Sequence, residues 1–346
     1  MLATSSVSRQ GRAGRALFAV LATALLGSTL AATPDERVGA ASVADRVLGP
    51  SECADCHTEE FEVWEASAHQ AGSRDLARSD RAREIASALG IRRIKNAERC
   101  TTCHFTVAGI DPDDLDTVAG VSCESCHGAS LDWIDVHNDF GGARGARDED
   151  AAHREERLRR SVEHGMVRPS ATDAIADRCF TCHTVADEEL VAAGHPTGAA
   201  FELVSWSQGE MRHNFLRGGG ESNALAPLEH RRHLYVLGQL TSLRHTVTAL
   251  TACGGPGAYA DDLCERVRRS LEALRAVHAA TCDDSVASVL AAADGLELAP
   301  RVAADDLLDA VERALTTLQT SGAMRSCSKL DALLPADTSF VGRPAR

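Results

Sequence analysis

The stretch SECADCHTEEFEVWEASAHQ, residues 51–70, contains a cysteine–histidine pattern that recurs along the chain. Cys53 and Cys56 are separated by two residues and followed directly by His57, and another histidine, His69, comes twelve positions later. Three further copies of this C-x-x-C-H spacing follow along the chain: Cys100, Cys103 and His104; Cys123, Cys126 and His127; and Cys179, Cys182 and His183. The spacing is that of c-type haem attachment, and four copies in one chain make a chance match untenable.

The chemistry of the pattern explains why its spacing is fixed. Two thiols add to the two vinyl groups of one porphyrin, and the histidine that follows binds the iron as its first axial ligand. A zinc site would need two such cysteine pairs on one metal, and a thioredoxin-like disulfide would not need the histidine in every copy. We therefore expect four covalently bound haem c groups, with the motif histidines as iron ligands.

The second axial ligand of each iron separates an electron carrier from a catalyst. Of the 14 histidines, four belong to the motifs, and beyond the initiator the chain has only three methionines, so we expect mostly bis-histidine ligation. Three histidines have a context that holds the ring toward a porphyrin. His69 follows VWEAS on an expected short helix, His137 follows LDWIDV, and His195 lies in the rigid turn AAGHPTG.

The other histidines give weaker signals. His164 and His213 are intermediate candidates, and His153 lies in the charged segment RDEDAAHREERLRR, where we expect it to be solvated. Surface or structural positions are expected for the remaining four: His230, His233, His245 and His278.

The N-terminus predicts export. Arg9, Arg12 and Arg15 precede the apolar run from Ala16 to Ala32, which is typical of a secretory signal peptide over residues 1–32. An uncleaved membrane anchor is the alternative, and membrane association is expected only in that case. Cleavage changes the formal net charge from -14 to -17, because the segment removes three arginines and no acidic residue. We expect a periplasmic protein whose acidic surface excludes nucleic acid and favours basic redox partners.

Composition and periodicity predict two domains and a mainly α fold. Aromatic residues are only 4% of the chain, and haems would supply the missing bulk of the core in a loop-rich cytochrome domain over residues 33–226. In residues 227–346, apolar residues recur at helical spacing in LYVLGQLTSLRHTVTAL, LCERVRRSLEALRAV and VAADDLLDAVERALTTL. This predicts a C-terminal bundle of three to five helices, which covers haems or presents a docking face.

Four cysteines lie outside the haem motifs, all of them in the predicted bundle. In an oxidising compartment they are expected to form two disulfides, with three connectivities possible. We expect Cys253 to pair with Cys264 across a tight Gly-Pro-Gly loop, and Cys282 to pair with Cys327.

The motifs also resemble a known family. The order and wording of VLGPSECADCHTEEFEVWEASAHQ, RCTTCHF, GVSCESCHGASLDWIDVH, RCFTCHT, AAGHPTGAAFE and MRHNF resemble the tetrahaem cytochrome c-554 family over roughly Leu48 to Gln239. The resemblance implies a mostly helical haem domain with closely packed haem pairs. It also implies three bis-histidine haems, for which His69, His137 and His195 are the candidates, and an open position on the second haem, at His104.

Three functions follow as hypotheses. The first is a periplasmic electron carrier between a donor and an acceptor protein. The second is an enzyme whose open haem at His104 binds and reduces a small nitrogen oxide such as nitric oxide, or acts on hydroxylamine. The third is a haem-bearing structural subunit docked through the helical bundle, which predicts a stable partner.

Overall fold

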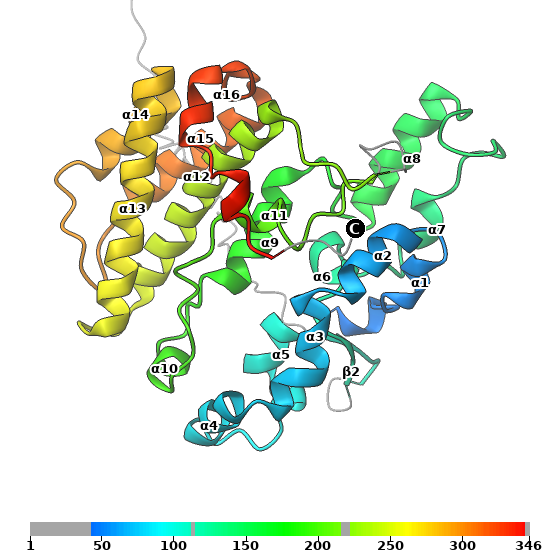
Figure 1. The fold of residues 1–346 in the computed structure, drawn as a ribbon, viewed down its shortest axis with the longest axis horizontal. Coiled ribbons are helices and arrows are strands. Elements are labelled where there is room, and N and C mark those ends of the chain that lie inside the picture. Colours follow the sequence, from blue (N-terminus) through cyan, green and yellow to red (C-terminus); the bar gives the residue numbers. More distant parts are fainter. Residues whose placement is uncertain (1–42, 112–114, 216–221, 343–346) are drawn as a thin grey trace, which may run out of the picture. The chain divides into compact units, whose positions relative to one another are not determined.

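The described chain is mainly helical, as the sequence predicts. The structure is a computed structural model that describes residues 43–111, 115–215 and 222–342 (Figure 1). The predicted signal peptide therefore lies outside the described residues. Among the helices that are described, none is both long and apolar enough to cross a membrane.

Short helices joined by loops make up the described part of residues 43–226, called the motif region here because all the cysteine motifs lie in it. Its α-helices are α1 (Ser51–Ala54), α2 (Thr58–Glu65), α3 (Ala68–Asp75), α4 (Asp80–Ala88), α5 (Glu98–His104), α6 (Cys123–His127), α7 (Ile134–His137), α8 (Ala151–Glu163), α9 (Thr172–His183), α10 (Glu188–Ala192) and α11 (Leu203–Ser207). Three short 3-10 turns accompany them: η2 (Ala44–Arg46), η3 (Leu76–Arg78) and η4 (Ile94–Asn96). Serine N-caps begin two of these helices, because Ser67 and Ser79 accept hydrogen bonds from backbone N–H groups of α3 and α4.

A small antiparallel sheet brings two motifs together. Strand β1 (Thr106–Ala108) directly follows α5, and strand β2 (Asp116–Ala119) directly precedes α6, with Thr106 opposite Ala119. The hydroxyl of Thr106 lies 2.9 Å from that of Ser122, the N-cap residue of α6. The second and third motifs, which end α5 and α6, therefore leave the same end of this sheet.

Long helices make up the rest of the described chain, called the bundle region here (residues 227–342). They are α12 (Leu228–Ala252), α13 (Ala258–Thr281), α14 (Asp284–Ala293), α15 (Asp305–Thr320) and α16 (Ala323–Ser326), followed by the 3-10 turns η5 (Ser328–Leu333) and η6 (Asp337–Ser339). Helix α12 packs against α13, α15 and α16, and α14 packs against α13 and α15 (Figure 1). The first two predicted helical segments fall within α12 and α13, and the third, residues 302–318, begins three residues before α15 and otherwise lies in it.

The main hydrophobic core crosses from the bundle region into the motif region. Buried side chains of α12, α13 and α15 form one cluster with Ala176 and Phe180 of α9 and with Leu203 and Val204 of α11. Gly238 allows this contact, because a Cβ atom there would lie 2.9 Å from the Cβ of Leu203. The fourth motif, at the end of α9, is thus attached to the bundle. The division into two domains at residues 226 and 227 stays a prediction.

Candidate functional site

Each cysteine motif lies at the end of a short helix. Helices α5, α6 and α9 finish at the motif histidines His104, His127 and His183, while the first motif starts in α1 and ends at His57 just before α2. Residues three apart on a helix share one side of it, so the two cysteines of the second, third and fourth motifs lie on the same side of their helices. Covalent attachment of one porphyrin by two thiols requires this arrangement.

Every motif histidine faces one histidine from elsewhere in the chain. The ring centroids lie 6.3 Å apart for His57 and His137, 6.3 Å for His183 and His69, 5.9 Å for His104 and His195, and 6.4 Å for His127 and His213. None of these pairs is local in sequence. The tertiary structure therefore supplies a second imidazole to each attachment motif.

These separations fit an iron between the two rings. Two imidazoles on opposite sides of one metal ion need a centroid distance of about 6 Å, the sum of two metal–nitrogen bonds of about 2 Å and the half-widths of two rings. Direct packing of two rings is closer, as the 4.2 Å between His183 and Phe201 illustrates. The residues present therefore fit a haem iron at each pair, which a motif histidine and the histidine facing it would hold.

Hydrogen bonds at Nδ1 leave the other ring nitrogen of four of these histidines available for a metal. Each Nδ1 faces a backbone carbonyl, at 2.9 Å for His127 and Val167, 2.5 Å for His137 and Ile134, 2.8 Å for His195 and Pro196, and 2.7 Å for His213 and Met211. A carbonyl oxygen only accepts, so Nδ1 must carry the proton and Nε2 keeps its lone pair. Metal-binding histidines typically show this second contact.

Burial favours the neutral form of three other rings among these pairs, those of His104, His183 and His69. It lowers the pKa of His104 and of His183 to about 4, with smaller contributions from neighbouring histidines. Burial also lowers the pKa of His69, and its Nδ1 has no hydrogen-bond partner within the described structure. Only a neutral imidazole can bind a metal, so burial prepares these side chains as ligands at neutral pH.

The first and third motifs are adjacent. A hydrogen bond joins the thiols of Cys53 and Cys123, and together with burial it raises the pKa of Cys53. The buried carboxylate of Glu124, inside the third motif, accepts from the backbone N–H of Leu48 and Gly49 at 3.0 and 2.8 Å. Chain segments just before the first motif are thereby tied to the third.

The fourth motif lies between the second and the third. A hydrogen bond between the thiols of Cys103 and Cys182 joins it to the second motif, and together with burial it raises the pKa of Cys182. Arg178, next to Cys179, donates to the Ser125 carbonyl of the third motif at 3.1 Å. In space the motifs therefore follow the order first, third, fourth, second.

The distal histidines differ from the expectation in two respects. His195 faces His104, whose iron the resemblance implies to be open, and His213 faces His127 although its sequence context made it only an intermediate candidate. His69 pairs with the fourth motif rather than with the first, which it follows directly. The signal that could have found His213 is MRHNF, one of the segments that carry the family resemblance.

The segment that holds the first three motifs is similar to a known family. Residues 52–128 match the family of cytochrome c554 and c-prime. The resemblance seen in the sequence is confirmed over this part of the chain. The match supports a c-type cytochrome with an electron-transfer or redox role and with covalently bound haem c. Comparison with curated proteins and with solved structures found no match.

The remaining histidines lie outside these four histidine pairs. His164 directs Nδ1 to the Asp132 carbonyl at 2.7 Å, and the partly exposed His153 contacts Glu149 at 2.8 Å. The buried His233 contacts the Thr172 hydroxyl at 3.1 Å. None of these three rings stacks on or faces a motif histidine within the described residues.

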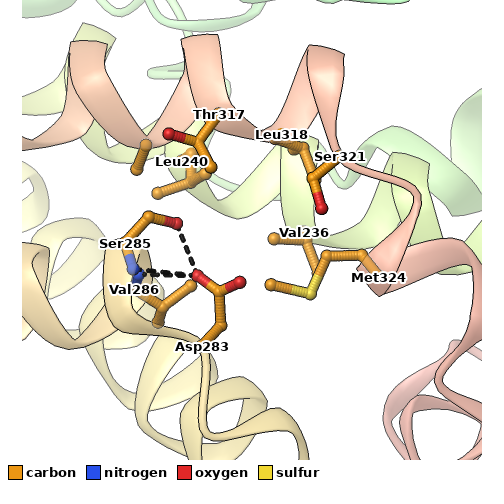
Figure 2. Close-up of a pocket in the computed structure, with 10 residues that line it drawn as sticks. Val236, Leu240, Asp283, Ser285, Val286, Thr317, Leu318, Ser321 and Met324 are labelled. Carbon is orange, nitrogen blue, oxygen red and sulfur yellow. Dashed lines mark hydrogen bonds between the residues drawn. The ribbon is translucent and has the colours of Figure 1, made fainter.

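A cluster of metal-binding side chains and an enclosed pocket are two other kinds of candidate site. Within residues 43–111, 115–215 and 222–342, no group of three or more histidine, cysteine or acidic side chains is placed to hold a metal ion. Figure 2 shows the small pocket between α12, α14 and α15, where Asp283 accepts hydrogen bonds from Ser285 and Val286. Its volume of about 10 Å³ has room for no more than one water molecule.

Proposed function

We propose that this protein is a periplasmic tetrahaem c-type cytochrome that transfers electrons between redox proteins. The observation that carries the proposal is the pairing of each motif histidine with one distal histidine at 5.9–6.4 Å. Haem c supplies reversible one-electron chemistry when it is bound. The eight motif cysteines would attach four such groups, and the eight paired histidines would hold their irons.

Histidine on both sides of every iron favours a carrier over an enzyme. Reduction of a nitrogen oxide at iron needs a free coordination position, which the hypothesis of an open haem assigns to His104. The ring of His195 faces that position, and its Nδ1 contact to the Pro196 carbonyl at 2.8 Å orients Nε2 toward it. Catalysis at this haem would require His195 to leave.

The order of the motifs supports a continuous path for electrons. Contacts join the first motif to the third, the third to the fourth, and the fourth to the second. Residues 47–73, around the first motif, contain six carboxylates and no lysine or arginine, and Cys56 is exposed there. We therefore propose this acidic end as the docking face for a basic redox partner, with an association rate that falls as salt increases.

Two further parts of the proposal come from the sequence. Export to the periplasm depends on the signal peptide over residues 1–32. The four cysteines of the bundle region are thiols in the structure, and we propose that they pair as expected after export. Cys253 and Cys264 share one buried cluster, and the thiol of Cys327 lies 3.8 Å from the carbonyl of Ala280, two residues before Cys282.

The number and spin state of the haems test the proposal. We expect the mass of the purified protein to exceed that of the mature chain by four haems, each of which is low-spin in the ferric state. We also expect the ferrous protein not to bind carbon monoxide. Fewer than four attached haems would contradict the tetrahaem assignment, and carbon monoxide binding by the wild type would favour the enzyme. A monomeric protein that small cytochromes reduce fully would count against the structural-subunit hypothesis.

Replacing His195 tests the ligand that distinguishes the two main functions. We expect His195→Ala to convert one haem of the four to high spin and to create one carbon monoxide site, because no other histidine among the described residues faces His104. The matched control is His164→Ala, whose ring is exposed and contacts only the Asp132 carbonyl. If His195→Ala leaves all haems low-spin, another residue holds that position.

A further inference from the structure

A buried arginine of the bundle region contacts the backbone at the end of the fourth motif. Arg266, on α13, is only 4% exposed. Its guanidinium donates to the Thr184 hydroxyl at 3.0 Å, to the Thr197 carbonyl at 3.0 Å and, more weakly, to the His183 carbonyl at 3.4 Å. A side chain from outside the family match therefore contacts the backbone of an expected iron ligand.

The surrounding backbone encloses this contact. Thr184 is 2% exposed, and the Tyr259 hydroxyl of α13 donates to the Val185 carbonyl at 2.9 Å. On the other side, Gly198 has φ +80°, and a Cβ atom there would lie 2.1 Å from the His183 carbonyl oxygen. No side chain fits between that loop and the motif, so the guanidinium and the His183 backbone share a buried, closely packed environment.

The charge of Arg266 has no direct counter-ion. In the part of the chain that the structure describes, no carboxylate lies within 4.0 Å of its guanidinium. Burial lowers the pKa of Arg266, but an arginine side chain remains protonated in proteins. Asp262, one turn earlier on α13, offsets part of the charge without a direct contact. A positive charge therefore persists in a region of low dielectric constant.

A second buried arginine provides the contrast. Arg157 on α8 donates to the His137 carbonyl at 2.5 Å, so it too contacts the backbone of an expected iron ligand. Glu149 accepts two hydrogen bonds from the same guanidinium, at 2.7 and 2.6 Å, and neutralises it. The backbone of His137 thus faces a neutral ion pair, whereas the backbone of His183 faces a net positive charge.

We infer that Arg266 raises the reduction potential of the haem attached through Cys179 and Cys182. A fixed positive charge in a low-dielectric environment stabilises the reduced state, which carries one positive charge fewer than the oxidised state. The effect is local, because the guanidinium lies on the backbone of His183 itself. This inference rests on the proposed function, since it requires haem at the fourth motif.

The test is a spectroelectrochemical titration of the full-length protein with its haems attached. We expect Arg266→Gln to lower the midpoint potential of one haem of the four, and Arg266→Lys, which keeps the charge, to restore most of the shift. The matched control is Arg275→Gln, an exposed arginine on the same helix, which should leave all four potentials unchanged. Equal shifts in the glutamine and lysine variants, or no shift in either, would overturn the electrostatic role.

Asp262→Asn provides a test that does not depend on removing the buried arginine. It deletes the negative charge that partly offsets Arg266, so we expect the same haem to shift to higher potential. Absence of an upward shift would contradict the inference even if Arg266→Gln failed to fold. The haem count separates the two proposals: fewer than four haems in the wild type refutes the proposed function, whereas four haems with unchanged potentials in the variants refutes this inference alone.

Discussion

The motif region and the bundle region are stabilised by different means. Most of the largest fully buried side chains lie in the bundle region, and all the leucines among them come after residue 228. Among the described residues before 172, Val63 is the one member of this group. The bundle packs its helices around one continuous core that includes α9 and α11. Before α9, the main buried cluster of the described motif region consists of Ala86, Ile94 and Phe105.

This difference shows what each region needs in order to fold. A long amphipathic helix buries its apolar side against its neighbours and needs no other component. Helices of four to nine residues, such as α1 to α7, are too short to be stable alone and have few apolar side chains to bury. We therefore expect covalently attached haem to supply the large apolar group that the motif region lacks, and the structure of that region to depend on it.

The largest expected effect is the loss of the motif region when haem cannot attach. With all eight motif cysteines replaced by alanine, we expect residues 43–171 to lose protection from hydrogen exchange, while α12, α13 and α15 keep theirs. Mass spectrometry of exchanged peptides would measure this, with the haem-loaded wild type as the control. Equal protection of residues 43–171 in both proteins would contradict this expectation, because that region would then fold without haem.

A core substitution in the bundle should have the complementary effect. Leu243 of α12 is fully buried, so Leu243→Ala is expected to lower the free energy of unfolding by about 2–5 kcal/mol. The haem absorption spectrum should not change, since no motif lies on α12. Leu228→Ala, at a 43% exposed position of the same helix, is the control and should cost no more than about 0.5 kcal/mol. Altered haem ligation in the Leu243 variant would contradict the separation of roles.

The ion pair between Arg157 and Glu149, which contacts the His137 carbonyl, predicts that the stability of the motif region depends on pH. Hydrogen bonds from Arg157 lower the pKa of Glu149 from 4.5 to about 2. A depressed carboxyl pKa stabilises the folded state fully above the ordinary value, and this contribution is lost as the pH falls toward the folded value. Between about pH 5 and pH 2, we therefore expect Glu149→Gln to lose less stability on acidification than the wild type.

Denaturant titrations at several pH values would measure the Glu149 effect. The control is Glu155→Gln, at an exposed position of α8, which should keep the pH dependence of the wild type. If Glu149→Gln and the wild type lost stability in parallel on acidification, the ion pair would not contribute to acid sensitivity.

The smallest expected effect concerns a helix cap in the bundle. Asp283 caps α14 by accepting from the backbone N–H groups of Ser285 and Val286 at 3.0 and 3.1 Å. Asp283→Ala is expected to lower the free energy of unfolding by about 1 kcal/mol, and Asp283→Asn should keep most of the cap. Thermal unfolding followed at a helical wavelength would measure both variants. An effect of the alanine variant on haem potentials would show that the two regions are coupled more tightly than their packing indicates.

Local sequence determined the parts of the site that depend on neighbouring residues. Two cysteines three positions apart and a following histidine share one turn of chain, so C-x-x-C-H predicts the attachment points and His57, His104, His127 and His183 without reference to the rest of the fold. The helices of the bundle were equally predictable, because the apolar spacing of residues 234–250, 263–277 and 302–318 is itself a local property.

Only the tertiary structure decided which distal histidine faces which motif. His69 pairs with His183 although it follows His57 in sequence, and His213 supplies the fourth ring although its sequence context made it only an intermediate candidate. The contact of Arg266 with the His183 carbonyl depends on how α13 packs against the motif region. The physical reason is common to all three: a ligand or a charge acts through space, and its partner is fixed by how short helices and loops pack together rather than by any spacing along the chain.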